Sequence, residues 1–549
     1  MAWVALVGPE IEENLSLRYL SACLRRAGFS AEILRFDTER DFGPLVQRIT
    51  ADPPLIVGLS LAFQWRAPDF LALACTLREG GYEGHITVGG HFGTFASREL
   101  LTDFPEIDTV CRQEAEETLV HLAELVRAAG RSPSGLNELP GLAYRAGDGS
   151  YAQSCLPRVP DLSELPFPDR SGTPAKAFDH GIAPLVSSRG CYANCTFCCI
   201  AAWHEQTLPG KRYRLRDPES VADEMAELHF GRGIDVFVFH DDNFFIPNHK
   251  KSRERLVALA DALEVRGVRE FGTVVKARPN DVERSVFDVL VDRLRCLRCY
   301  VGIETDADQG LSTLQRWAAP SANRRAIEIV REMDLFVCFN VLLFDPDTTM
   351  ESLRTNVEFM RWAPEFPFNF SRVELYAGTP LLARMQREGR VRGDYLQWDY
   401  DLGSPEVERA FSLAMQCFTP RNFGSGALAN DIQAIRFDLS VARHFHPDRL
   451  PTELFERGRE LSVRLAVDTA EGLTRILDRV AGSTRRGDAA FVRELSAGLR
   501  GTETQIRADM LAIAEELTGL IGRGRPITTT GDVVATPLQR GAAAMEVSP

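Results

Sequence analysis

The sequence predicts an α/β protein built from two successive strand–helix series and a helical C-terminal region. Short apolar runs alternate with amphipathic segments over residues 1–130, and the same alternation returns from residue 183. The strand pattern is lost after about residue 400. Because parallel strands connected by helices produce this alternation, we expect a doubly wound, Rossmann-like N-terminal domain, a partial (β/α)6 barrel and a helical C-terminal domain.

Composition and charge limit the kinds of partner. Of the 549 residues, 44% are hydrophobic and 26% are charged, which is typical of a globular protein with two or three domains. The formal charge is −14 and no long run of Lys or Arg occurs, which argues against nucleic acid or an anionic membrane. The N-terminal apolar run has no basic region before it, and no stretch reaches the roughly 18 apolar residues of a membrane span. We expect a cytoplasmic protein with a small-molecule partner and no membrane contact.

The N-terminal domain is expected to span residues 1–130. Its predicted strands are 3–8, 31–35, 55–60, 85–88 and 108–111, and its predicted helices are 14–27, 42–50, 67–80, 95–103 and 114–129. Ligands of doubly wound sheets bind at the carboxyl ends of the strands. The segments that follow those strand ends are therefore the candidate binding loops.

The rest of the chain divides by composition and periodicity. Residues 131–182 are rich in Gly, Pro, Ser and Asp and are predicted to be a linker with one hairpin near 142–151. Residues 183–385 are predicted to form the partial barrel, with strands near 183–187, 235–240, 271–275, 299–303, 336–343 and 371–376. Residues 386–522 are expected to be helical and to shape a substrate pocket, and residues 523–549 to be a disordered tail.

Three cysteines on one loop are the strongest chemical signal. Cys191, Cys195 and Cys198 lie within eight residues, directly after the apolar run 183–186. Three such thiolates can each bind one iron of a [4Fe–4S] cubane, and no fourth ligand follows at ferredoxin spacing. The fourth iron is then open and can chelate the amino and carboxylate groups of S-adenosylmethionine (SAM).

Two other metal sites are compatible with cysteines in this chain. Cys199 could complete a zinc site, although adjacent thiolates rarely converge on one tetrahedral ion and no second Cys/His pair lies nearby. An electron-transfer cluster could take a remote fourth ligand, for which Cys296 and Cys299 are the candidates. We favour the three-cysteine cluster and regard Cys199 as a packed neighbour.

The motif Cys-x3-Cys-x2-Cys after a first barrel strand resembles the radical SAM superfamily, and the flanking segments resemble its cobalamin-binding branch. The resemblance covers about residues 1–385 and includes FHDDNFF at 239–245, ARP at 277–279, YVGIET at 300–305 and AGTP at 377–380. It implies a [4Fe–4S] cluster, SAM and cobalamin as cofactors. Polar groups at barrel strand ends face the ligand, although Asp and Asn also favour loop caps. The expected SAM contacts are Asp242, Asn243, Glu304, Asn340 and Tyr376.

The N-terminal domain lacks the dinucleotide fingerprint G-x-G-x-x-G after its first strand, which argues against nicotinamide binding. Segments 13–20, 88–92 and 112–116 instead resemble the cobalamin-binding half of the branch, which usually has Gly where Gln113 and Ala115 stand. No histidine lies in an Asp-x-His-x-x-Gly pattern, so the resemblance implies base-off cobalamin with no histidine ligand. The expected cobalamin contacts are Asn14, Ser16, Ser60, Gln64, Trp65, Gly89, Gly90, His91, Arg112 and Glu114.

The resemblance implies a cobalamin-dependent radical SAM methyltransferase. Such an enzyme transfers a methyl group from methylcobalamin to an unactivated carbon, or a phosphinate phosphorus, of a small-molecule biosynthetic intermediate. A cobalamin-dependent cyclase or rearrangement enzyme is the alternative, and an Fe–S or corrinoid carrier without catalytic activity is a third. The implied protein partner is an external one-electron reductant of the flavodoxin or ferredoxin type. The sequence assigns no catalytic side chain and no substrate.

Overall fold

The computed structural model describes residues 3–207, 212–423, 426–482 and 487–522. The chain divides into two compact units. The first unit comprises Met1–Thr173, Phe197–Arg216 and Leu375–Asp399, and the second comprises Pro174–Thr196, Asp217–Glu374 and Tyr400–Pro549. The disorder predicted for 523–549 concerns residues outside the described part.

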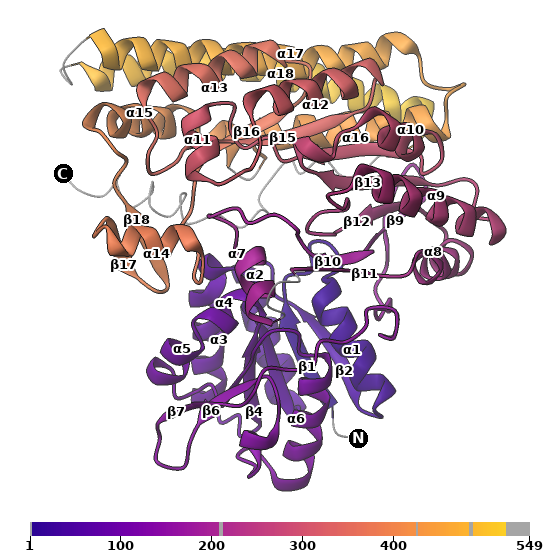
Figure 1. Ribbon diagram of the computed structural model, residues 1–549, viewed down its shortest axis with the longest axis vertical. Coiled ribbons are helices and arrows are strands. Elements are labelled where there is room, and N and C mark those ends of the chain that lie inside the picture. Colours follow the sequence, from indigo (N-terminus) through magenta and orange to yellow (C-terminus); the bar gives the residue numbers. More distant parts are fainter. Residues whose placement is uncertain (1–2, 208–211, 424–425, 483–486, 523–549) are drawn as a thin grey trace. The chain divides into compact units, whose positions relative to one another are not determined.

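The first unit is a doubly wound sheet (Figure 1). Its elements in the first 129 residues are β1 (Trp3–Gly8), α1 (Leu15–Arg26), β2 (Ser30–Arg35), α2 (Glu39–Ala51), β3 (Ile56–Ser60), α3 (Ala67–Glu79), β4 (His85–Gly89), α4 (Gly90–Phe95), α5 (Ser97–Asp103), β5 (Thr109–Cys111) and α6 (Glu116–Ala129). Later segments add β6 (Leu142–Arg145), β7 (Tyr151–Gln153), α7 (Cys199–Thr207), β11 (Tyr213–Leu215), α14 (Pro380–Arg387), β17 (Val391–Asp394) and β18 (Gln397–Tyr400).

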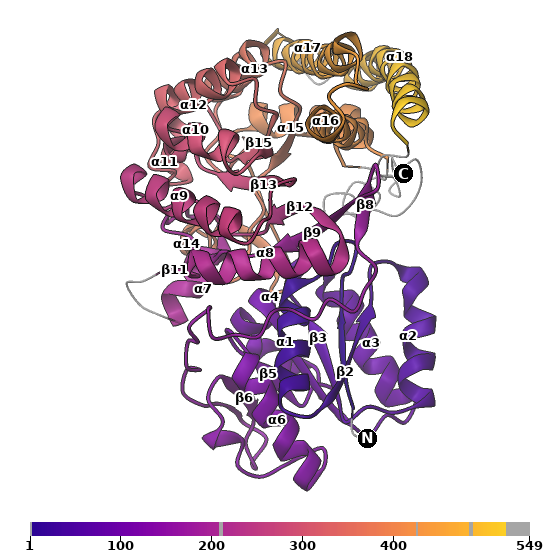
Figure 2. The same ribbon diagram turned by 90° about the vertical axis from the view of Figure 1, so that its right-hand side faces the viewer.

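The sheet of the first unit has the strand order β2-β1-β3-β4-β5-β6-β7. The first five strands are parallel, and the hairpin β6–β7 continues the sheet in antiparallel pairing. Alternate residues of β1 face opposite cores: Ala5 and Val7 pack with α2 and α3, while Val4 and Leu6 pack with α1 and α6. Helices on both faces of the sheet are visible in Figure 2. The predicted doubly wound fold is confirmed.

The second unit is built on an open seven-stranded sheet. Its elements up to β16 are β8 (Ala175–Ala177), β9 (His180–Leu185), β10 (Ser188–Gly190), α8 (Pro218–Arg232), β12 (Ile234–Phe239), α9 (His249–Val265), β13 (Gly272–Ala277), α10 (Arg284–Asp292), β14 (Cys296–Val301), α11 (Asp308–Thr313), α12 (Pro320–Glu332), β15 (Val337–Phe344), α13 (Met350–Trp362) and β16 (Phe368–Arg372). The order is β16-β15-β14-β13-β12-β9-β8; the first six strands are parallel and β8 is antiparallel. The predicted partial barrel of six parallel strands is confirmed, and we call it the half-barrel.

Four long helices follow the half-barrel in the second unit. They are α15 (Pro405–Asn422), α16 (Leu428–Phe445), α17 (Thr452–Gly482) and α18 (Asp488–Leu520). Figure 1 shows α17 and α18 running alongside each other. Residues of α16, α17 and α18 share one hydrophobic core with Val236, Val274 and Cys338 of the half-barrel strands. The C-terminal helices are therefore bound to the half-barrel by apolar burial. Within the described residues, every helix is too short or too polar to cross a lipid bilayer.

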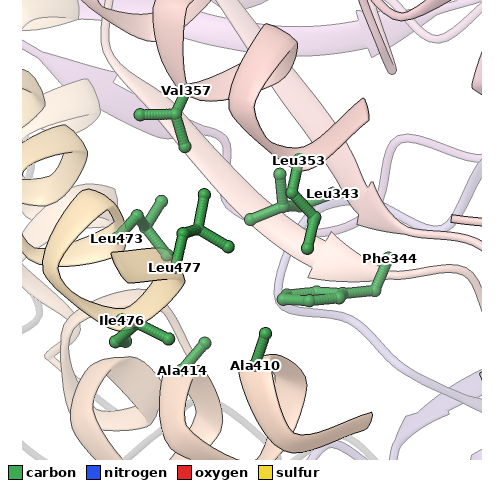
Figure 3. A pocket seen from close by; sticks show the side chains of 9 residues that line it. All are labelled: Leu343, Phe344, Leu353, Val357, Ala410, Ala414, Leu473, Ile476 and Leu477. Atoms are coloured by element: carbon green, nitrogen blue, oxygen red, sulfur yellow. The ribbon is translucent and has the colours of Figure 1, made fainter. Parts of the chain in front are cut away.

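A small apolar cavity lies where α13, α15 and α17 meet β15 (Figure 3). Leu353 of α13 lines it and is only 1% exposed. Truncating Leu353 would enlarge a void that apolar neighbours already fail to fill. We expect Leu353→Ala to lower the free energy of unfolding by about 2–5 kcal/mol, measured by urea denaturation. Leu511→Ala, at a site 44% exposed on α18, is the matched control. Equal losses in the two variants would contradict a tightly packed junction.

Candidate cofactor sites

The loop that carries the cysteines begins at Ser187, which is hydrogen-bonded to a fully buried carboxylate. Asp241, two residues after β12, accepts hydrogen bonds from the Ser187 amide at 3.0 Å and the Ser187 hydroxyl at 2.7 Å, and a further one from the Ser188 hydroxyl. Arg255 of α9 donates to the Ser187 hydroxyl at 2.5 Å and to the Ser187 carbonyl at 3.1 Å. Burial raises the pKa of Asp241, whereas Arg255 and the serine donors lower it. Asp241 thus holds the residues that directly follow β9 in place.

The cysteine motif spans the division between the units. Cys191 and Cys195 belong to the second unit, and Cys198 belongs to the first, where it directly precedes α7. Burial raises the pKa of Cys191 to about 11, and the Ala193 amide donates to its sulfur at 3.5 Å. Among the described residues, no three potential ligand side chains are already gathered as a metal site. The assignment of the cluster therefore rests on the spacing of the three cysteines and on their position in the loop after β9.

The loop is anchored at its second cysteine by the segment after α11. The Thr196 amide donates to the Leu314 carbonyl at 3.0 Å, and its hydroxyl donates to the Thr313 carbonyl at 2.8 Å. Two arginines reach the Cys195 sulfur: Arg278 Nη1 at 3.1 Å and Arg316 Nη1 at 3.3 Å. Cations beside a buried thiolate sulfur suit an anionic iron–sulfur cluster. Sequence reasoning missed Arg316 because it lies in no motif and nothing local distinguishes it.

The cysteines considered as alternative metal ligands lie apart from the loop that carries the motif. Cys199 is the first residue of α7. Cys296 opens β14 and pairs with Thr273 near the start of β13, whereas the cysteine motif follows the carboxyl end of the parallel strand β9. Burial raises the pKa of Cys296 to about 12 and that of Cys299 well above its ordinary value. A fourth ligand from the start of β14 is disfavoured by position, because Cys296 and the cysteine motif lie at opposite ends of the parallel strands.

Two predicted SAM residues follow β12. Asp242 is exposed, and its Oδ2 accepts from the Gly190 amide at 2.8 Å, so it lies beside the cysteine loop. Asn243 is buried, and its amide nitrogen donates to the Phe245 carbonyl at 2.9 Å while its side chain also bonds Asp281. The structure thus gives Asn243 internal hydrogen bonds. SAM contact stays a prediction for both residues.

Glu304, three residues after the end of β14, meets Asn340 in the middle of β15. Glu304 has a left-handed backbone with φ 63°, forms an isolated parallel bridge with Val341, and donates its amide to the Asn340 carbonyl at 3.1 Å. Left-handed backbone at a residue other than Gly is costly and concentrates at functional sites. Burial raises the pKa of Glu304, while Arg316 and Arg278 oppose that shift. Asn340 is exposed. Both keep their predicted role as SAM contacts.

In the first unit, the predicted cobalamin residues follow β1, β3, β4 and β5, which are neighbours in the sheet. Asn14 caps α1 by accepting from the Leu17 amide at 3.3 Å, and its Nδ2 donates to the Pro9 carbonyl at 3.2 Å. Ser16 is exposed in the first turn of α1, and Ser60 ends β3. The sheet therefore gathers these loops at one edge, while Asn14 has a structural role that sequence reasoning did not assign.

The segment after β3 packs on the chain that returns to the first unit after β16. Gln64 is buried, and its Oε1 accepts from the Ala377 amide at 3.1 Å. Trp65 is half-buried next to it. Tyr376, the fifth predicted SAM residue, precedes Ala377 and accepts a hydrogen bond at its carbonyl from the Thr379 hydroxyl at 2.7 Å. The first unit therefore places Tyr376 next to a predicted cobalamin residue.

The turn after β4 has a shape that only glycine permits. Gly90 has φ 93°, and a Cβ there would lie 2.8 Å from the Ala62 amide nitrogen. Gly89 precedes it as the last residue of β4. The ring of His91 lies 5.1 Å from the ring of Trp203, which belongs to α7 and donates to Thr94 at 3.4 Å. The helix that directly follows Cys198 thus packs on the predicted cobalamin loop.

The loop after β5 holds the last predicted cobalamin residues. The Arg112 amide donates to the Gly141 carbonyl at 2.6 Å. Gln113 has φ 64°, a left-handed backbone that explains why glycine is usual at this position. Glu114 is buried and forms an ion pair with Arg214 of β11. Hydroxyl, amide and main-chain groups at this sheet edge suit the amide-bearing rim of a corrin ring, so the donor set fits cobalamin.

Comparison with known families agrees with both parts of the fold. The B12 binding domain model matches residues 3–123, and the Radical SAM superfamily model matches residues 185–360. The chain belongs to the B12-binding radical SAM enzymes. The matched ranges contain every predicted cluster cysteine and all the predicted cobalamin residues. Together the two domains imply cobalamin, SAM and a [4Fe–4S] cluster as cofactors.

Relatives of this B12-binding radical SAM enzyme include proteins named as methyltransferases and proteins named as cyclases. An uncharacterized methyltransferase of Pyrococcus horikoshii is 23% identical over 67% of this chain and 77% of that protein. An anaerobic magnesium-protoporphyrin IX monomethyl ester cyclase of Cereibacter sphaeroides is 25% identical over 57% of this chain and 50% of that protein. The solved structure of the cobalamin-dependent radical SAM enzyme OxsB covers 100% of this chain and 84% of that chain, with a TM-score of 0.66 and 16% identity. That likeness supports the fold.

Proposed function

We propose that this chain is a cobalamin-dependent radical SAM methyltransferase. The proposed reaction moves a methyl group from methylcobalamin to an unactivated carbon, or a phosphinate phosphorus, of a small-molecule biosynthetic intermediate. The observation that carries the proposal is the joining of a B12-binding unit to a half-barrel whose first strand leads into Cys-x3-Cys-x2-Cys. The methyltransferase name of a relative that matches 67% of the chain supports methyl transfer over other uses of the same cofactors.

The proposed parts have separate tasks. When bound, the cluster and SAM supply a 5′-deoxyadenosyl radical, and the corrinoid supplies a methyl group that a substrate radical can accept. Cys191, Cys195 and Cys198 are the proposed cluster ligands. Glu304 and Asp242, at the half-barrel strand ends, are proposed to hold SAM through its amine and ribose hydroxyls. A cytoplasmic one-electron donor of the flavodoxin or ferredoxin type is the proposed source of electrons.

The test needs no knowledge of the substrate. The chain would be reconstituted anaerobically with iron, sulfide and hydroxocobalamin, reduced with titanium(III) citrate, and given SAM with a trideuterated methyl group. Methyl transfer predicts S-adenosylhomocysteine together with trideuterated methylcobalamin by mass spectrometry. A protein that holds both cofactors and yields neither product would overturn the methyltransferase proposal.

A cyclase or rearrangement enzyme is the second candidate. It is favoured by the magnesium-protoporphyrin ester cyclase among the relatives. In the same experiment, 5′-deoxyadenosine without S-adenosylhomocysteine would identify this second class. If 5′-deoxyadenosine is absent as well, the result would favour the third possibility, a carrier protein that binds the cofactors without catalysis.

The cobalt is proposed to lack a histidine ligand. No Asp-x-His-x-x-Gly occurs in the sequence, and the ring of His91 packs near Trp203. We expect the cob(II)alamin form of the holoprotein to give an electron paramagnetic resonance spectrum of base-off cobalt, without the triplet splitting that a nitrogen ligand causes. His91→Ala should leave that spectrum unchanged. A nitrogen splitting that vanishes in His91→Ala would show instead that His91 binds cobalt.

A further inference from the structure

Two buried arginines converge on one sulfur of the cysteine loop. Arg278 is 7% exposed and Arg316 is 4% exposed, and both donate to Cys195 Sγ, at 3.1 Å and 3.3 Å. The two side chains come from different parts of the half-barrel, one after β13 and one after α11. Burying two guanidinium groups beside each other is costly unless an anion compensates them.

The positions of the arginines are fixed by a hydrogen-bonded frame. Arg278 also donates to the Arg316 carbonyl, and Arg316 donates to the Gly302 carbonyl after β14. Asn280 holds the next residue, Trp317, by donating to its carbonyl at 2.8 Å. Gln315 and Trp317 have left-handed backbones, with φ 47° and 51°, on either side of Arg316. This strained backbone indicates that the turn is held in place to present Arg316.

No carboxylate of the described residues forms a close ion pair with these two guanidinium groups, although Asp281 and Glu304 lie near enough to interact electrostatically with Arg278. Arg278 forms no ion pair with an acidic side chain in the described ranges 3–207, 212–423, 426–482 and 487–522. Arg316 has one acidic neighbour, Glu304, whose Oε1 lies 4.0 Å from its Nη2. That distance is at the limit of an ion pair and beyond hydrogen-bond range. The anionic group closest to both cations is therefore the Cys195 sulfur, together with whatever the cysteine loop binds.

We propose that Arg278 and Arg316 are positioning residues that raise the reduction potential of the cluster held by Cys195. The inference rests on the proposed cluster ligation. One-electron reduction adds a negative charge to the cluster, so a fixed cation at the ligand sulfur stabilises the reduced form more than the oxidised form. Cluster potentials respond to net charge and to hydrogen bonds on the sulfurs, and these arginines supply both. The pair thereby eases the reduction that SAM cleavage requires.

The test is a redox titration of the reconstituted full chain without SAM, followed by electron paramagnetic resonance of the reduced cluster. Arg316→Gln removes the charge, and Arg316→Lys keeps it. Arg324→Gln is the matched control, because Arg324 pairs with Asp306 at 2.8 Å and is 40% exposed. We expect Arg316→Gln to lower the ratio of reduced to oxidised cluster about tenfold at a fixed potential, which is 59 mV for one electron. Arg316→Lys and Arg324→Gln should titrate close to the wild type.

Each outcome decides the proposal. A fully loaded Arg316→Gln cluster with the wild-type potential would overturn it, as would a shift of equal size in Arg324→Gln. If the Arg316→Gln chain does not take up the cluster, the Arg316→Lys variant decides. A wild-type reduction potential in Arg316→Lys supports the proposal, and a lowered reduction potential overturns it. An unchanged potential with weakened SAM binding would assign the arginines to the SAM carboxylate instead. A wild-type chain that holds no cluster would contradict the ligation itself, which separates the two proposals.

Discussion

Replacing Cys195 by Ala is expected to abolish the cluster, with bound iron falling from about four atoms per chain to near zero. The remaining two thiolates cannot hold a cubane, and Arg278 and Arg316 would lose the sulfur that both contact. Formation of 5′-deoxyadenosine should fall to the background. Iron analysis, the absorption near 400 nm and chromatography of the SAM products would measure these losses.

The matched control for that variant is Cys199→Ala. Cys199 lies four residues further on and opens α7, so it is assigned no iron. We expect Cys199→Ala to keep the wild-type iron content and SAM cleavage. Loss of metal in Cys199→Ala, together with zinc in the purified chain, would instead identify the tetrahedral zinc site. Normal cluster content in Cys195→Ala would contradict the three-cysteine assignment.

Replacing Asp241 by Asn is expected to lower the free energy of unfolding by about 1–3 kcal/mol, since it removes a fully buried acceptor carboxylate whose charge favours the nearby Arg255 guanidinium. Burial lowers the pKa of Arg255, and Asp241 is the charge that opposes this shift. The Asn side chain also cannot accept all the hydrogen bonds that Ser187 and Ser188 donate. The exit of β9, and with it the start of the cysteine loop, should become mobile.

Asp242→Asn is the control for this second experiment. Asp242 is the next residue in the chain but is exposed, so its substitution should change stability by no more than about 0.5 kcal/mol. Urea denaturation of both variants would compare the losses, and hydrogen exchange of the Ser187 and Ser188 amides would locate them. Equal stability of Asp241→Asn and Asp242→Asn would show that the buried carboxylate does not hold the loop.

The fold was predictable from the sequence because strands and helices have different apolar periods. In the first unit, the run Trp3–Gly8 is apolar on both faces, as a central parallel strand must be when helices cover it on each side. The six half-barrel strands were found for the same reason, although β14 and β16 each begin three residues earlier than predicted. The extension of the sheet by β6 and β7 was not foreseen, because strand pairing depends on partners distant in sequence.

The candidate sites were predictable only where chemistry is concentrated in a short segment. Cys191, Cys195 and Cys198 are recognisable from spacing alone. Arg316 is not, because it reaches Cys195 from 121 residues away by way of a strained turn. Asn14 shows the converse case: its cobalamin contact stays a prediction from the resemblance, and the structure adds a helix cap that the sequence reasoning did not assign.

The sequence by itself determined the succession of elements, the cysteine loop and the absence of a dinucleotide fingerprint. Each of these features depends only on residues that are close together in the chain. Only the tertiary structure decided that α7, which directly follows Cys198, packs through Trp203 on His91 and Thr94. Only it decided that two buried arginines meet at Cys195. Both depend on contacts across long sequence separations, which are set by the packing of whole elements and leave no local signal.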